Sequence, residues 1–285
     1  MSCAFGMILA FSLGLVGQLF PSLIPLIAFI VTMVSAQVVR YFNIGAPGFF
    51  FFTFAALIGT YIPFKIEDYF MVIGLVAVGT IVANAMVLLY SLSVIYIFKH
   101  TPKPIPKAGE FGFGVIVIDP IIIASFVAFA TYLQGFLELE RGYWVGVSCA
   151  AVLTAITFKQ IWIKQTQRIL GTIVGVSFAY FLLHFHFSPI EFAILMMILM
   201  FFAELVVVRN YALAMIFVTP YTTYLAEVGS FMNYNPDILI QARVLDIAIG
   251  SVIGLLGGAV MHWKFLRNIL EKITHKIIYK WVGNE

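Results

Sequence analysis

Charged side chains are scarce in this sequence. Only 10% of its 285 residues are Asp, Glu, Lys or Arg, whereas 62% are hydrophobic. A soluble domain has about 25% charged and about 45–50% apolar residues, so no soluble fold could bury this much apolar surface. The apolar runs are roughly 16–25 residues long, the length that a helix needs to cross a bilayer. They lack the alternation that marks the strands of a transmembrane β-barrel. The composition therefore predicts an all-α integral membrane protein.

Cysteine is also rare, and the sequence shows no motif of enzyme chemistry. Cys3 and Cys149 both lie in apolar runs without metal-ligand spacing, so we interpret them as small packing residues. Nucleotide-binding motifs, catalytic triads and metal-ligand clusters are not visible, which gives no support to an ATP-driven pump or an enzyme. We expect no cofactor, no metal site and no nucleic-acid partner. The first apolar run also lacks the basic segment and the A-x-A site of a cleavable signal peptide.

The apolar segments predict about ten transmembrane helices. Residues 1–98 form a first bundle, and residues 111–263 form a second bundle of six helices. Between them, residues 99–110 (KHTPKPIPKAGE) carry three prolines and three lysines and should be an extended cytoplasmic linker. Residues 264–285 predict a basic amphipathic helix on the membrane surface, with a soluble helix as the alternative. The predicted spans are 4–20, 23–39, 47–62, 69–98, 113–133, 142–158, 169–187, 189–208, 210–225 and 242–263.

Lysine and arginine in the loops predict the orientation of these spans. Cytoplasmic loops carry an excess of both residues, and alternating loops of this chain fit that rule. Both termini are therefore expected in the cytoplasm, and the localisation is expected to be a bacterial inner membrane. The basic positions assigned to the cytoplasmic side are Arg40, Lys99, Lys103, Lys107, Lys159, Lys164, Arg168 and Arg209.

An internal repeat relates the two bundles. In both, a span ends in Val-Val-Arg, an aromatic residue and an asparagine follow, and an aromatic-rich span comes next: SAQVVRYFNIGAPGFFFF at Arg40 and ELVVVRNYALAMIFVTPY at Arg209. On this basis the first bundle lacks about two helices of the six-helix unit, through N-terminal shortening or because the protein is naturally short. Parallel repeats are a transporter architecture. Chance similarity between apolar sequences is the alternative.

One stretch has a family pattern. An aromatic pair opens a span, a basic loop follows, and an arginine then begins the next span just before Gly-Thr and a further glycine. These residues are Tyr143, Trp144, Arg168, Gly171, Thr172 and Gly175. The pattern resembles the fusaric acid resistance family of inner-membrane exporters, which includes aromatic carboxylic acid efflux proteins. RNYALAMIFVTP (209–220) and RVLDIAIGSVIG (243–254) look similar too.

The resemblance covers residues 113–263 and has two departures. It implies two six-span halves, often with a large cytoplasmic domain after the first half, where this chain has only the short linker. Plant aluminium-activated malate channels are distantly similar, which keeps an anion channel open as an alternative.

Ionisable residues within the spans are the candidates for coupling to protons. Such groups are costly in a bilayer and usually face the bundle interior or a water-filled path. A buried carboxyl of Asp119, Glu204 or Asp246 could take up and release the coupling proton. Structural alternatives are that Glu204 pairs with Arg209 and that Asp246 pairs with Arg243, three residues away on the same helix face.

Arginines, polar groups and aromatic rings are the candidates for binding an anion. An arginine can hold a carboxylate through two parallel hydrogen bonds. The candidate substrate-binding residues are Trp144, Arg168, Arg209, Asn210, Tyr211 and Thr219, with Arg243 as a further arginine. Alternatively, Tyr143 and Trp144 anchor the chain at the membrane interface and Arg209 extends to that interface. Thr219-Pro220 indicates either a broken helix or a kink that neighbouring hydroxyls satisfy. Gly171, Gly175, Gly250 and Gly254 are expected to allow close helix packing.

These features predict a transporter that exports small aromatic or amphiphilic organic anions, driven by protons. A passive organic-anion channel and a structural or assembly protein without flux are the alternatives. The expected partners are the organic anion, protons and the lipid bilayer, with a homo-oligomer or an adaptor protein as further possibilities.

Overall fold

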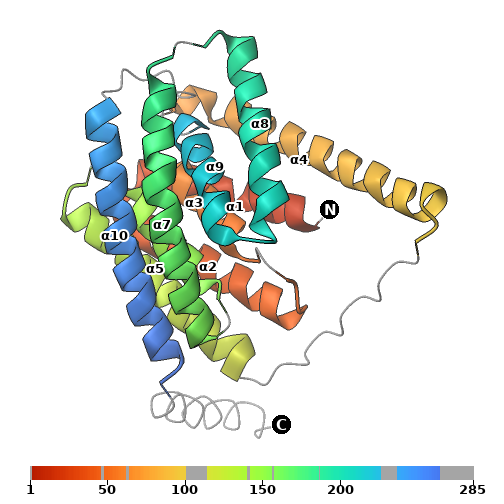
Figure 1. The fold of residues 1–285 in the computed structure, drawn as a ribbon. Coiled ribbons are helices and arrows are strands. Elements are labelled where there is room, and N and C mark those ends of the chain that lie inside the picture. Colours follow the sequence, from red (N-terminus) through yellow and green to blue (C-terminus); the bar gives the residue numbers. More distant parts are fainter. Residues whose placement is uncertain are drawn as a thin grey trace, which may run out of the picture.

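A computed structural model describes residues 2–45, 48–61, 64–100, 114–139, 142–155, 157–185, 187–225 and 236–263, with side chains from 241 onward in the last range. Ten α-helices account for most of these residues (Figure 1), which confirms the all-α class. Most of the predicted linker and the whole predicted tail, 264–285, lie outside the described residues. The helices are α1 (Ser2–Leu19), α2 (Ile24–Tyr41), α3 (Phe50–Tyr61), α4 (Tyr69–Leu92), α5 (Asp119–Phe136), α6 (Tyr143–Leu153), α7 (Phe158–Leu183), α8 (Pro189–Val207), α9 (Tyr211–Thr223) and α10 (Pro236–Met261).

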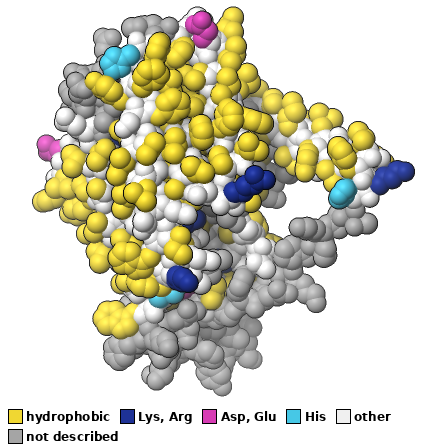
Figure 2. Space-filling model, viewed as in Figure 1, with side chains coloured by type: hydrophobic (Ala, Val, Ile, Leu, Met, Phe, Trp, Pro, Cys, Tyr) yellow, Lys and Arg dark blue, Asp and Glu magenta, His cyan; other side chains and the backbone are white. Residues whose placement is uncertain are grey.

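Seven of the helical segments are long and apolar enough to cross a membrane. The apolar helices α3 and α6 have 12 and 11 residues. At about 1.5 Å per residue they cover only about 16–18 Å, less than the ~30 Å hydrocarbon core. Figure 2 shows hydrophobic side chains over most of the visible face and few charges, as a lipid-facing surface requires. The chain is therefore a multi-span membrane protein in which at least two of the predicted spans are short helices.

Two helices begin earlier than the sequence pattern predicts. The predicted basic loop before residue 169 is wrong, because α7 begins at Phe158. The Thr157 side chain accepts a hydrogen bond from the backbone N–H of Gln160, and the Gln160 side chain accepts one from the backbone N–H of Thr157. This capping box satisfies backbone donors at the start of the helix. Helix α10 likewise begins at Pro236 rather than at residue 242. These earlier starts place Arg168 within α7 and Arg243 within α10, whereas the sequence pattern predicts each arginine at a helix end.

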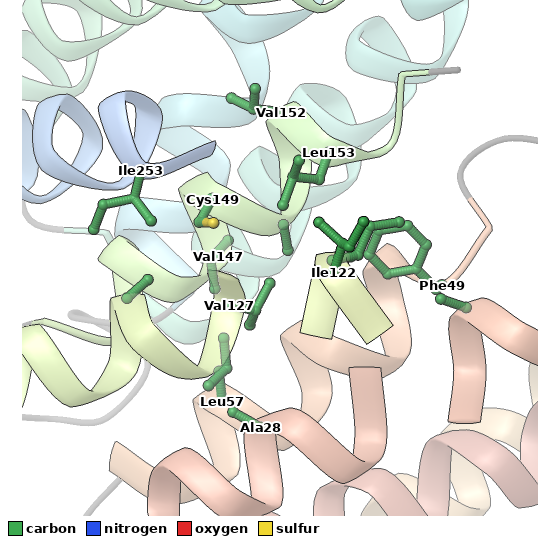
Figure 3. Close-up of a cluster of buried hydrophobic side chains, with 14 of the residues drawn as sticks. Ala28, Phe49, Leu57, Ile122, Val127, Val147, Cys149, Val152, Leu153 and Ile253 are labelled. Carbon is green, nitrogen blue, oxygen red and sulfur yellow. The ribbon is translucent and has the colours of Figure 1, made fainter. Parts of the chain in front are cut away.

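The main hydrophobic core crosses the predicted boundary between the halves. Figure 3 shows Leu57 of α3 near Val127 of α5 and Val147 of α6, with Ile253 of α10 on the other side of α6. The two predicted bundles therefore share the main core of the described residues, and a smaller hydrophobic cluster lies within each of them. Helix α4 does not contribute to this main core. It extends away from the other helices (Figure 1), and Val72 is its one buried residue.

Glycines bring several pairs of helices into backbone contact. A Cβ atom on Gly250 of α10 would overlap the carbonyl oxygen of Val145 in α6, and one on Gly254 would lie 2.8 Å from the Cβ of Val152. On α7, Gly171 and Gly175 lie against the backbone of α9 at Ala212 and Met215, and Gly14 of α1 lies against Ala56 of α3. All four glycines predicted for packing therefore lie at helix crossings.

A buried ion pair joins the two halves at the start of α5. The Nη1 of Arg40 in α2 lies 2.7 Å from the Oδ2 of Asp119, and the two side chains are 16% and 7% exposed. Asp119 follows a π-helical turn, Gly114–Ile118, and precedes Pro120. Charge-assisted hydrogen bonds of this length are strong inside a protein. Arg40, near the end of α2, is therefore largely buried and holds α2 against α5.

The packing of α10 on α6 generates the first prediction. Gly250→Ala should lower the free energy of unfolding by roughly 1–3 kcal/mol, because the added methyl forces α10 away from the backbone of α6. Thermal unfolding in detergent measures this. Gly74→Ala on α4 is the matched control, since no described atom lies within 4 Å of a Cβ there. Equal melting temperatures for the two variants would contradict the close approach.

The ion pair generates the second prediction. Asp119→Asn should lower the free energy of unfolding by about 2 kcal/mol, because it removes the charge that Arg40 faces. A double-mutant cycle with Arg40→Gln measures the coupling between the two side chains by thermal unfolding. Additive effects of the two substitutions would show that the pair does not join α2 to α5.

Candidate functional site

Helix α6 forms the floor of the candidate site. All eleven of its residues are buried. Tyr143 and Trp144 are 4% and 3% exposed, so their interpretation as interfacial anchors is wrong. Their rings lie 4.8 Å apart, and the ring of Tyr61, at the end of α3, lies 5.3 Å from that of Tyr143. Trp144 and Ser148 are four residues apart and therefore lie on one face of α6, about one turn from each other.

Arg243 of α10 lies over the ring of Trp144. Its Cζ is 3.3 Å from the ring centroid, and its Nη2 donates a hydrogen bond to the Oγ1 of Thr222 in α9. The arginine is 6% exposed. A guanidinium that stacks on an aromatic face keeps its edge of N–H donors available for another partner.

Arg168 of α7 approaches the same face of α6 one turn later. Its Nη2 donates to the Oγ of Ser148 at 3.1 Å, and its Nη1 donates to the hydroxyl of Tyr211 at 3.2 Å. It is 8% exposed. Since Trp144 and Ser148 are i and i+4 on one helix, the two guanidinium groups are neighbours. We call Trp144, Ser148, Arg168, Arg243 and Asp246 the arginine cluster.

Several buried N–H donors of the arginine cluster have no acceptor among the described residues. They are Nε and Nη1 of Arg243, Nε of Arg168 and Nε1 of Trp144. Leaving a buried donor unsatisfied costs about 1–3 kcal/mol, and more when the group is charged. The donors therefore provide a ready set of hydrogen bonds for an anion with two acceptor oxygens.

Asp246 is the buried carboxyl of the cluster. It is 1% exposed and one turn from Arg243 on α10, and its Oδ2 has no hydrogen-bond partner within the described part of the chain. The predicted ion pair with Arg243 does not form, because that guanidinium is held over Trp144 and by Thr222. The carboxylate still lies near enough to interact electrostatically with Arg243. Asp246 therefore places a carboxylate beside the unsatisfied N–H donors, but it does not neutralise them through direct contact.

Lys164 and Tyr211 lie beside the cluster on α7 and α9. The Nζ of Lys164 donates to the Oγ1 of Thr154 at 2.8 Å and lies 5.5 Å from the centroid of the Tyr211 ring. Lys164 precedes Arg168 by one turn and is only partly buried. Positive side chains therefore lead along α7 from a partly exposed position to the buried cluster.

Other predicted site residues lie away from the cluster. Glu204 and Arg209 are exposed at the end of α8. Asn210 is exposed too, and its Oδ1 accepts hydrogen bonds from the backbone N–H of Ala212 and Leu213, which caps α9. Asp119 is held by Arg40 at the start of α5. The arginine cluster thus contains Trp144, Arg168, Arg243 and Asp246 of the predicted residues.

Thr219 lies in a continuous helix. The predicted break at Thr219-Pro220 is wrong, because α9 passes through Pro220. Proline removes a backbone donor, and nearby threonine hydroxyls bond to the carbonyls of this region. Thr222 donates to the carbonyl of Val218 at 2.8 Å, and Thr223 donates to that of Thr219 at 2.8 Å. Thr219 itself is buried against Gly175.

Sequence reasoning missed Ser148, Thr222 and the inward position of Lys164. Ser148 and Lys164 each lie four residues from a predicted site residue, Trp144 and Arg168, so helical spacing could have identified them. The signal for Lys164 was the T-x-x-Q pattern of Thr157 to Gln160, which begins α7 well before the predicted span. Thr222 is placed by tertiary packing, and no local pattern marks it.

The part of the chain that builds the cluster is similar to known proteins. Residues 123–257 match the family model described as "Fusaric acid resistance protein-like". The matched segment contains all of α6 to α9 and every residue of the arginine cluster. The resemblance predicted from residues 143–175 is therefore confirmed for this part of the chain.

A relative extends this similarity to a membrane protein of Bacillus subtilis (strain 168). The chain is 33% identical over 138 residues to the "Uncharacterized membrane protein YvaC" of that organism. The aligned segment is 48% of this chain and 22% of the relative's length, so the chain spans only about a fifth of that protein. No solved structure matches the chain.

Proposed function

We propose that the protein transports small organic anions across the membrane and binds them at the arginine cluster. The observation that carries this proposal is the pair of buried guanidinium groups with unsatisfied donors, Arg168 and Arg243, side by side on one face of α6. Ionised groups inside a membrane usually mark substrate or ion pathways. The similarity of residues 123–257 to the fusaric acid resistance family supports transport rather than catalysis.

The balance of buried charge favours an anion as the ligand. The buried ionisable groups of the cluster are two arginines and one aspartate. An excess buried charge is costly in a low-dielectric interior unless a counter-charge is present. A carboxylate supplies both the charge and the acceptor oxygens that these donors lack.

Aromatic rings favour a flat, apolar body on this anion. Trp144 and Tyr143 continue into a series of rings with Tyr61 on one side and Phe54, whose ring is 5.9 Å from that of Trp144, on the other. Aromatic pairs in offset or tilted arrangements attract one another. An aromatic carboxylic acid combines this body with the charged group that the arginines bind.

Proton coupling is assigned to Asp246. Of the three predicted carboxyls, it lies in the cluster, whereas Asp119 is in an ion pair and Glu204 is exposed. A proton on Asp246 would change the charge next to the bound anion, which links the two binding events. We retain the predicted direction, export from the cytoplasm of a bacterium, as part of this proposal.

Loss of anion binding is the third prediction. Arg243→Gln and Arg168→Gln should each weaken binding of 4-hydroxybenzoate at least about tenfold, because each removes a buried charge that the carboxylate contacts. Isothermal titration of the purified protein measures the affinity. Lys159→Gln is the matched control, since this cation is exposed on α7 outside the cluster. Unchanged affinity in both arginine variants would overturn the proposed site.

Uncoupling from protons is the fourth prediction. In proteoliposomes with an imposed pH gradient, Asp246→Asn should abolish accumulation of labelled 4-hydroxybenzoate against its own gradient and retain downhill movement. The cause is that an amide cannot exchange the coupling proton. Glu67→Gln, at an exposed carboxyl, serves as the control. Downhill movement alone in the unmodified protein would instead show a passive anion channel.

A further inference from the structure

The net charge of the buried side chains in the arginine cluster determines how many negative charges its ligand should carry. We propose that Asp246 makes the cluster selective for anions with one negative charge over anions with two, and this rests on the proposed function. The buried groups are two cations and one anion on the neighbouring helices α7 and α10, and both cations lie against one face of α6. One bound negative charge therefore neutralises the cluster, and a second would be in excess.

The position of Asp246 allows it to discriminate between ligands by their charge and not to act as a structural counter-ion of Arg243. Its carboxylate has an unsatisfied oxygen, and no direct ion pair within the described residues ties it to Arg243. If it were bonded to the guanidinium, it would occupy the donors that the ligand needs. Held one turn away on α10, it leaves those donors open and adds repulsion to a ligand that carries a second carboxylate.

The other groups around Asp246 leave this count unchanged. Tyr61 lies close enough to interact electrostatically and is neutral near pH 7. Lys164 lies one turn before Arg168, is partly exposed, and donates its hydrogen bond to Thr154, so it is not one of the buried groups of the count. Gln165, buried on α7 one turn before Arg168, carries no charge and has an unsatisfied Oε1. Gln165 therefore offers a position at which a negative charge can be added with little change of shape.

The size of the effect follows from Coulomb's law. Two unit charges about 8 Å apart at an effective dielectric constant of about 20 repel strongly enough to change a binding constant on the order of tenfold or more. The aspartate should therefore lower the affinity for a dianion relative to a monoanion by about this factor. Replacing it with a neutral residue should remove the discrimination.

Three benzene carboxylates test the proposal by isothermal titration of the full chain. Isophthalate carries two charges at about pH 7.5, benzoate carries one, and monomethyl isophthalate has nearly the size of isophthalate with one charge. In the unmodified protein, both monoanions should bind more tightly than isophthalate. In Asp246→Asn the affinity for isophthalate relative to monomethyl isophthalate should rise on the order of tenfold, whereas Asp246→Glu should retain the original order.

A second variant tests the same charge balance by adding a negative charge instead of removing one. Gln165→Glu adds a negative charge beside Arg168 and should weaken binding of benzoate on the order of tenfold. This measurement tests the proposal even where Asp246→Asn fails to fold. If Asp246→Asn binds all three ligands in the original order, or if Gln165→Glu binds benzoate unchanged, the valence proposal is wrong while the transport proposal stands. If the unmodified protein and Arg243→Gln both fail to bind every ligand, the proposed function is wrong and the valence proposal with it.

Discussion

The complete burial of α6 constrains the rest of the structure. An 11-residue helix with every side chain buried must be surrounded on all faces, and α3, α5, α7 and α10 provide those surfaces. Close approach on the α10 side depends on Gly250 and Gly254, which let backbone meet backbone. Because α6 cannot shift without opening these contacts, its side chains are fixed supports. Trp144 and Ser148 can therefore hold two arginines at a constant separation.

The polar groups of the cluster are positioned from three directions. Helix α7 brings Arg168 to Ser148, α10 brings Arg243 to Trp144, and α9 supplies Tyr211 and Thr222 as second contacts for the two arginines. Each guanidinium is thus oriented by an aromatic or hydroxyl partner and not by a carboxylate. A neutral support fixes the geometry without cancelling the charge, so the positive potential stays available to a ligand.

The sequence predicted the number and order of the helices because long apolar runs and proline-rich breaks are local signals. The sequence pattern placed Arg168 at a helix end because Lys159, Lys164 and Arg168 were interpreted as one basic loop. The Thr157–Gln160 capping box contradicts that loop and was visible in the sequence. By contrast, the burial of Tyr143 and Trp144 depends on α3 and α10, and no local pattern distinguishes a buried aromatic pair from an interfacial one. The internal repeat stays a prediction.

The N-terminus of α6 adds to the electrostatics of the cluster. A helix carries a partial positive charge at its N-terminus, and the first residues of α6 are Tyr143 and Trp144, both buried inside the protein. Since Trp144 is the second residue of α6, this helix end lies beside the ring that Arg243 covers, so the helix end and the two guanidinium groups favour negative charge at one place. Asp246 is the group that limits how much negative charge this place accepts.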